Sequence, residues 1–140
     1  MKAEITWLGH MRFIANADSN RGIIAEAPEE GCETETLGPT PMELMLMGIG
    51  TCTASDVVWV LKKSRTQFDK LEIRMQAERA PEDPKRFTKI HIDYVLTGKG
   101  LKDKVVSRAI RLSQEKYCSA MSSVVLGGVT VTASHTIVES

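Results

Sequence analysis

The chain has 140 residues and a formal net charge of zero, with 18 basic and 18 acidic side chains. This length fits one domain with a sizeable core, so we expect residues 1–140 to form a single domain. The charges form no basic stripe and no polybasic cluster, which gives no indication of binding to nucleic acid or to a membrane surface. The N-terminal segment lacks the apolar core of a signal peptide, so we expect a reducing cytoplasm, where paired cysteines are more often catalytic, transient or metal-bound than permanent links.

The N-terminal part predicts a three-stranded meander. Residues 3–8 alternate between polar and strand-forming side chains, and short strands are expected again over residues 12–16 and 23–26, with turns between them. Residues 28–41 are acidic, contain glycine and proline, and show no periodicity, which indicates a surface loop.

A helix start follows this loop. Thr40 suits the capping position, Pro41 the first helical position, and Glu43 completes a capping box. The segment from residue 42 to residue 61 is apolar on every side, as is typical of a helix buried on all sides. Its apolar run is interrupted by two glycines and an aspartate, and we expect it to be slightly too short and too polar to span a membrane.

The remaining pattern predicts two strands over residues 71–77 and 90–96, a helix over residues 101–123 and a final strand over residues 129–133. The order β-β-β-α-β-β-α-β indicates an α+β fold with antiparallel sheets around a buried central helix. One sheet covers only one side of such a helix. We therefore expect a second copy of the chain to cover the rest in an obligate homodimer.

Cys52 and Cys118 are the chemically informative residues, because a fold that brings them together allows one disulfide to form and break. Each has two interpretations: a small buried hydrophobe, or a redox thiol, with Cys52 as the attacking thiolate and Cys118 as its resolving partner. Breaking the helix at Gly48 and Gly50 would place Cys52 near a helix N-terminus, which favours the thiolate. Asp56, one turn after Cys52, would raise the thiol pKa if its carboxylate faced the sulfur.

The other candidates are weaker. Cys32 lies among glutamates and is expected to be an incidental surface thiol. Glu43 is either only the capping residue or also a carboxylate that orients an arginine over the thiolate, and Arg12 and Arg21 are the candidates for that arginine. The three histidines are scattered and no C-x-x-C spacing appears, so neither a metal site nor a nucleotide cofactor is indicated.

The order of motifs resembles the family of osmotically inducible protein C and organic hydroperoxide resistance protein (OsmC/Ohr). The resemblance rests on Thr40-Pro41-x-Glu43 before the helix with Cys52, on the strand that opens at Arg86-Phe-Thr-Lys-Ile-His-Ile92, and on Glu115-Lys-Tyr-Cys118. Together these motifs span nearly the whole chain. The Gly-x-Gly-x-Cys and Glu-Lys-Tyr-Cys segments look most like the YhfA-like branch.

The resemblance implies an intertwined homodimer with active sites at the subunit interface, which reduces organic hydroperoxides without a prosthetic group. It implies that Cys52 is the peroxidatic cysteine and Cys118 the resolving one, restored by a dithiol reductant of the lipoyl type. An N-terminal arginine and a glutamate early in the helix flank the thiolate in the family, for which Arg12 and Glu43 are the candidates. The glutamate here comes one residue later than is common in the family.

Two functions therefore remain open from the sequence. The first is a cysteine-based organic hydroperoxide reductase, with Met42, Met45, Met47 and Trp59 among the residues that line an apolar pocket. The second is a dimer of the same fold without enzymatic activity, which binds an apolar ligand or reports on the redox state.

Overall fold

The computed structural model describes residues 1–28 and 36–140, which form two compact units, Met1–Met47 and Gly48–Ser140. Each unit is described by itself. The predicted surface loop lies partly outside the described residues, and so does Cys32.

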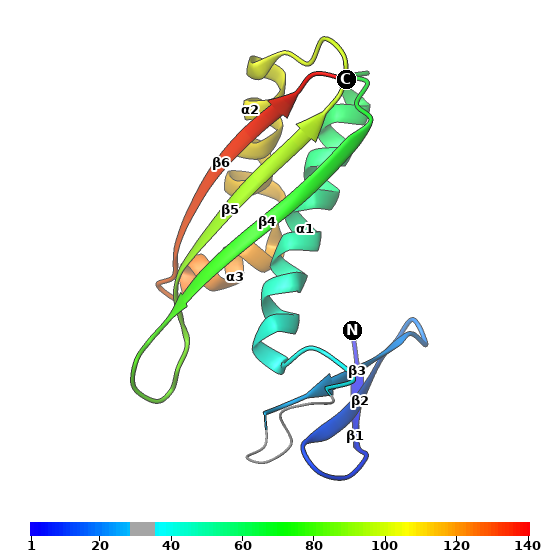
Figure 1. Cartoon of the computed structure of the whole chain (residues 1–140), viewed down its shortest axis with the longest axis vertical. Helices are drawn as coiled ribbons and strands as arrows, with labels where there is room; N and C mark the ends of the chain where they lie inside the picture. The colour runs from blue at the N-terminus through cyan, green and yellow to red at the C-terminus, as the bar shows by residue number, and fades with distance from the viewer. Residues whose placement is uncertain (29–35) are drawn as a thin grey trace. The chain divides into compact units, whose positions relative to one another are not determined.

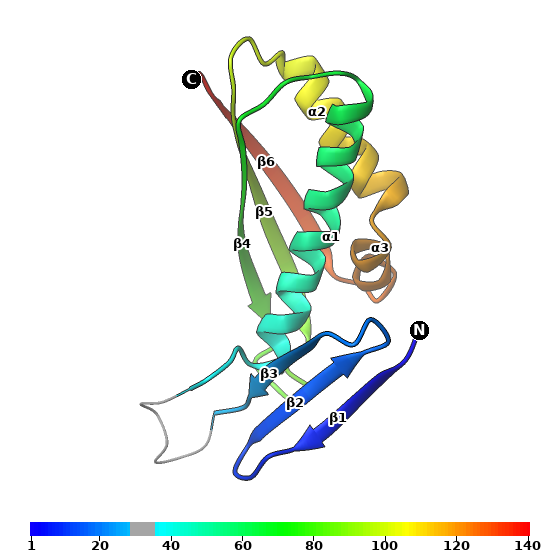
Figure 2. The same ribbon diagram turned by 90° about the vertical axis from the view of Figure 1, so that its right-hand side faces the viewer.

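The N-terminal unit contains the predicted meander. Strands β1 (Ala3–Trp7), β2 (Arg12–Ala17) and β3 (Gly22–Glu26) pair in antiparallel fashion in the order β1-β2-β3, which Figures 1 and 2 show in blue. The turn between β1 and β2 uses positive φ angles at Gly9 and His10. Left-handed backbone of this kind allows the tight reversal that the sequence pattern predicts.

Helix α1 (Pro41–Lys63) begins at the predicted capping box. The Thr40 N–H donates to Glu43 Oε2 over 2.7 Å, and the Glu43 N–H donates to Thr40 Oγ1 over 3.3 Å. These two bonds satisfy backbone donors that a helix N-terminus otherwise leaves unpaired. The helix runs without a break through Gly48 and Gly50, so the interruption that would have placed Cys52 near a helix N-terminus does not occur.

The C-terminal unit contains the end of α1 and a second sheet. Strands β4 (Lys70–Arg79) and β5 (Phe87–Thr97) pair in antiparallel fashion, as expected. Strand β6 (Thr130–Val138) pairs with β5 in parallel, so the prediction of antiparallel sheets is wrong for this pair. Helices α2 (Asp103–Leu112) and α3 (Ser119–Leu126) supply the long crossover that a parallel connection requires.

All the helices of this unit lie on one face of its sheet (Figures 1 and 2). The core between sheet and helices is apolar, with fully buried side chains at Val57, Leu61, Ile90, Ile92, Leu96 and Val106. At Gly50 a Cβ atom would lie only 2.5 Å from Met75 Sδ on β4. Glycine at this position therefore allows α1 to approach the sheet closely.

Only one side of α1 is buried within a single chain in this unit. Ile49, Thr53, Val57 and Leu61 repeat every four residues and are buried, whereas Trp59 is 51% exposed. The expectation of a helix buried on all sides does not hold within one chain, because the sheet and the other helices cover one side only. Contrary to the sequence expectation, α1 is long and apolar enough to cross a membrane. The core helix of a soluble protein can have the same length and composition.

Candidate functional site

Cys52 lies in the middle of α1, about three turns from its N-terminus, and is half-buried. At this depth the sulfur lies beyond the useful reach of the helix dipole, whose effect is concentrated in the first turn. Activation of Cys52 therefore has to come from groups around the sulfur.

Cys118 lies at a break between helical segments, where a continuous helix over residues 101–123 was predicted. After α2 the chain forms η1, a π-helical turn over Ser113–Tyr117, and Cys118 then adopts an extended conformation before α3. Its Sγ accepts a hydrogen bond from the Met121 N–H over 3.4 Å and so caps α3. The side chain is only 3% exposed. The break turns Cys118 from a helix-surface residue into a buried cap that projects toward α1.

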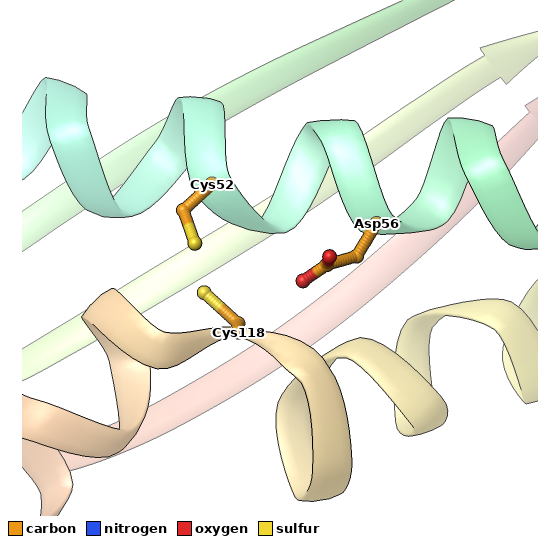
Figure 3. Close-up of side chains that lie close together, drawn as sticks. All are labelled: Cys52, Asp56 and Cys118. Carbon is orange, nitrogen blue, oxygen red and sulfur yellow. The ribbon is translucent and has the colours of Figure 1, made fainter.

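The two sulfur atoms point toward each other across the gap between α1 and the start of α3 (Figure 3). Both cysteines are free thiols, and their sulfurs lie with a carboxylate oxygen of Asp56 in a cluster whose atoms are all within 4.8 Å of one another. Reduction and oxidation of this pair therefore require only local movement of the side chains. These three residues also form a group that could hold a metal ion.

Burial dominates the ionisation of Cys118. The pKa of this thiol is raised to about 12; removal from water is the largest cause, the neighbouring Cys52 and Asp56 contribute in the same direction, and the Met121 N–H opposes the shift. A thiol with such a pKa holds almost no thiolate at neutral pH. Cys118 is therefore poorly suited to be the first nucleophile as long as Cys52 remains in its reduced form.

A buried chain of hydroxyl groups ends at Asp56. The Ser113 hydroxyl donates to Asp56 Oδ2 over 3.1 Å, and its oxygen lies 2.8 Å from Thr53 Oγ1. Thr53 Oγ1 lies in turn 2.6 Å from the Tyr94 hydroxyl. Because each hydroxyl has one proton, the Ser113 bond to the carboxylate orients the chain, with Tyr94 donating to Thr53 and Thr53 to Ser113.

This hydroxyl chain links three elements: Tyr94 on β5, Thr53 on α1 and Ser113 at the start of η1. All three side chains are fully buried. Burial raises the pKa of Tyr94, although the hydrogen bond with Thr53 opposes the shift. These residues were not predicted from the sequence. The available signal was Thr53 itself, a polar side chain in the otherwise apolar stripe of Ile49, Val57 and Leu61.

The remaining predicted site residues lie in the N-terminal unit, where each has a partner. Arg12 Nη2 lies 3.0 Å from Glu26 Oε1 in a salt bridge, and this arginine lowers the pKa of Glu26. The Glu43 carboxylate accepts from the backbone and hydroxyl of Thr40, which lower its pKa. Glu26 rather than Glu43 is thus the carboxylate that holds Arg12 here. The catalytic roles assigned to Arg12 and Glu43 remain predictions.

A groove of about 380 Å³ lies between α1 and α2 in the C-terminal unit. Trp59 and Tyr117 meet edge to face at its wall, with ring centroids 5.6 Å apart. Three basic side chains, Lys63, Lys104 and Arg108, also line it. Because Tyr117 precedes Cys118 directly and Trp59 lies two turns after Cys52, the groove shares its aromatic wall with the two segments that carry the cysteines.

We expect the Thr53→Val variant to lower the free energy of unfolding by about 1–3 kcal/mol, because it leaves the hydroxyls of Tyr94 and Ser113 without their shared partner. Adding Tyr94→Phe to this variant should cost less than the sum of the two single substitutions, since it removes one of the orphaned hydroxyls. Equilibrium unfolding of the reduced protein by urea, with the protein concentration held fixed, measures these free energies.

Ser55→Ala is the matched control, because the Ser55 hydroxyl is exposed and, among the described residues, bonds only within its own helix, to the Thr51 carbonyl. Its effect should stay within about 0.5 kcal/mol. Strict additivity of the Thr53 and Tyr94 substitutions would show that the chain of hydroxyls is not a coupled unit.

Comparisons with known proteins identify the family of this chain. The family model described as OsmC-like protein matches residues 33–134. Protein YhfA of Escherichia coli strain K12 is 35% identical over 138 residues, which cover 99% of this chain and 98% of that protein.

Solved structures show the same fold. A hypothetical protein from Aquifex aeolicus VF5 is 28% identical with a TM-score of 0.85, and the match covers 99% of this chain and 96% of that protein's chain. The organic hydroperoxide resistance protein OhrB of Bacillus subtilis is 20% identical with a TM-score of 0.66, and the match covers 97% of this chain and 98% of that protein's chain. At this identity it supports the fold alone. The resemblance found in the sequence is confirmed, and the chain belongs to the OsmC-like protein family.

Proposed function

We propose that this protein is a thiol-dependent peroxidase that reduces organic hydroperoxides through Cys52 and Cys118. The observation that carries the proposal is the approach of two free thiols from distant parts of the sequence, with sulfurs that face each other (Figure 3). Membership of the OsmC-like family supports it, since related folds include proteins named for organic hydroperoxide resistance.

Cys52 makes the first attack. Its thiolate attacks the distal oxygen of the hydroperoxide, so an S–O bond forms as the O–O bond breaks, and the leaving alkoxide takes a proton and departs as an alcohol. Cys52 becomes a sulfenic acid. The high pKa of Cys118 supports this assignment, because Cys118 stays protonated at neutral pH.

Cys118 completes the cycle by condensing with the sulfenic acid, which forms the disulfide and releases water. Oxidation of Cys52 prepares this step. The hydrogen bond and charge of Cys52 are among the causes that raise the pKa of Cys118, and a neutral sulfenic acid no longer supplies that charge. The Met121 N–H remains in place and stabilises the developing Cys118 thiolate.

A dithiol reductant restores the pair by thiol–disulfide exchange, and the family resemblance favours a lipoyl dithiol. The protein needs no prosthetic group for this cycle. We retain Arg12 as the proposed cation that activates Cys52 and Glu43 as a proposed supporting carboxylate, both by resemblance. We also propose a cytoplasmic location, in keeping with the redox chemistry.

We further propose that the protein acts as a homodimer. Within one chain the C-terminal unit leaves large apolar side chains exposed, with Trp59 at 51%, Val125 at 48% and Leu126 at 86%. The burial of such side chains between two copies of the chain would remove their apolar area from water, which favours association. A second copy of the chain covers these side chains in the proposed assembly.

Light scattering should therefore find one folded species of twice the chain mass of 15.5 kDa, with no folded monomer on dilution to micromolar concentration. A compact, stable monomer at that concentration would contradict the proposed dimer.

A second candidate function is a dimer that binds an apolar ligand and changes slowly with the redox state. Two observations favour it: the Asp56 carboxylate lies beside both sulfurs and is among the causes that raise the pKa of Cys118, and a groove lies against Trp59 and Tyr117. Rates of thiol oxidation separate the two candidates.

The decisive assay titrates thiols after mixing the reduced protein with one equivalent of cumene hydroperoxide or of hydrogen peroxide. We expect rapid loss of two thiols per chain with cumene hydroperoxide and slower loss with hydrogen peroxide. Cys52→Ser should abolish the reaction, because no other residue is proposed to attack the peroxide. Cys118→Ser should still allow one turnover that ends at a sulfenic acid, detected by a dimedone adduct.

Cys32→Ser is the matched control for these variants and should react as the wild type does. Slow loss of thiols with both peroxides, unaffected by Cys52→Ser, would favour the ligand-binding candidate.

A further inference from the structure

We propose that the reduced protein binds one zinc ion between Cys52, Asp56 and Cys118. This binding does not depend on the proposed peroxidase activity. The three residues come from α1 and from the start of α3, and their ligand atoms lie within 4.8 Å of one another (Figure 3). Zinc bound by thiolates and a carboxylate in a tetrahedron needs ligand atoms roughly 3.5–3.8 Å apart. The cluster therefore closes on the ion by side-chain movements of about 1 Å.

The ligand types fit zinc better than other common ions. Two thiolates exclude the hard cations magnesium and calcium, which take oxygen ligands. The carboxylate favours a divalent ion over copper(I), which prefers soft sulfur ligands throughout. A water molecule completes the tetrahedron in a site with three protein ligands. Cys52 and Asp56 are only half-buried, so water can reach the ion.

Charge also favours a cation at this place. The deprotonated ligand set carries three negative charges, and among the described residues no lysine, arginine or histidine forms a salt bridge with Asp56. The bond that the structure gives its carboxylate is the one from the Ser113 hydroxyl to Oδ2. A divalent ion compensates this charge, and it replaces the thiol protons on binding.

The hydroxyl chain orients the carboxylate for this role. Because Ser113 holds Oδ2, the other oxygen of Asp56 remains available to the ion. Thr53 and Tyr94 in turn fix the Ser113 hydroxyl from the core. Hydrogen bonds that orient a ligand in this way are typical of metal sites in proteins, and their loss weakens metal binding about 10- to 100-fold.

Zinc and the disulfide exclude each other, because both use the two sulfur atoms. Oxidation of the zinc-bound pair by an organic hydroperoxide consumes two protons, forms the S–S bond, and releases one alcohol, one water and one zinc ion. The two thiolates lose two electrons, and the O–O bond gains them. This release step, unlike the binding itself, rests on the proposed peroxidase activity.

The test is competition for zinc between the reduced protein and a chromophoric chelator of micromolar affinity, without any peroxide. We expect one zinc ion per chain for the reduced wild type and none for the disulfide form prepared with diamide. Failure to withdraw zinc from the chelator, or equal binding by the disulfide form, would overturn the proposal. Neither result bears on peroxidase activity, which the thiol assay measures separately.

Variants locate the ion. Cys52→Ser and Cys118→Ser should each lose zinc binding, and Asp56→Asn should weaken it at least about tenfold while keeping an oxygen for the Ser113 bond. Asp93→Asn is the matched control, because the Asp93 carboxylate likewise accepts from a serine, Ser134, and is not part of the cluster. Wild-type affinity in Asp56→Asn or in either cysteine variant would contradict the assignment.

Cobalt provides a readout that needs no variant. Cobalt(II) in the reduced wild type should give a tetrahedral absorption spectrum with a thiolate-to-metal charge-transfer band, and this band should vanish on oxidation with diamide. An octahedral spectrum without the charge-transfer band would place the ion on surface carboxylates and refute the site.

Discussion

The hydrogen bond between Thr53 and Ser113 is the interaction on which the site depends. It joins α1 to the start of η1 across the core, with 2.8 Å between two buried hydroxyl oxygens. Ser113 is also the residue whose carbonyl accepts the Cys118 N–H over 2.9 Å, which closes the π-helical turn. One serine therefore fixes both the carboxylate of Asp56 and the backbone of Cys118, and so determines how the two sulfurs face each other.

The same arrangement sets the order of the proposed chemistry. A buried cap position keeps Cys118 protonated, while Cys52 is half-buried and less shielded from solvent. Oxidation of Cys52 removes one of the charges that disfavour the Cys118 thiolate, so the second step follows the first. Asp56 is among the causes that raise the pKa of Cys118, but it also provides a ligand for a cation. Its presence is therefore easier to understand if the reduced pair also holds a metal ion.

The sequence predicted best those features that depend on neighbours along the chain. The capping box at Thr40 and Glu43, the N-terminal meander and the antiparallel β4–β5 pair were all recognised, because local residue types determine them. The direction of β6 was missed, because it depends on how the chain between the strands crosses the sheet. The break at Cys118 was missed too, since the apolar spacing of Ile110 and Met121 continues across it.

The candidate site was predictable only in part for the same reason. The motif around each cysteine identified Cys52 and Cys118, but the sequence carried no information on the approach of their sulfurs. In the hydroxyl chain, Thr53 bonds to Tyr94, which is 41 positions away in the sequence, and to Ser113, which is 60 positions away. No local pattern reveals contacts over such separations. Arg12 was nominated for its place in the sequence, whereas its ion pair with Glu26 follows from strand register, which sets the two residues opposite each other on β2 and β3.

The central claim is that Cys52 and Cys118 form one redox pair. Peptide mapping after treatment of the reduced protein with one equivalent of organic hydroperoxide tests it most directly. The account predicts a disulfide between the peptides that contain Cys52 and Cys118, with Cys32 recovered as a free thiol. A main bridge that includes Cys32, or over-oxidation of Cys52 without any bridge to Cys118, would contradict it.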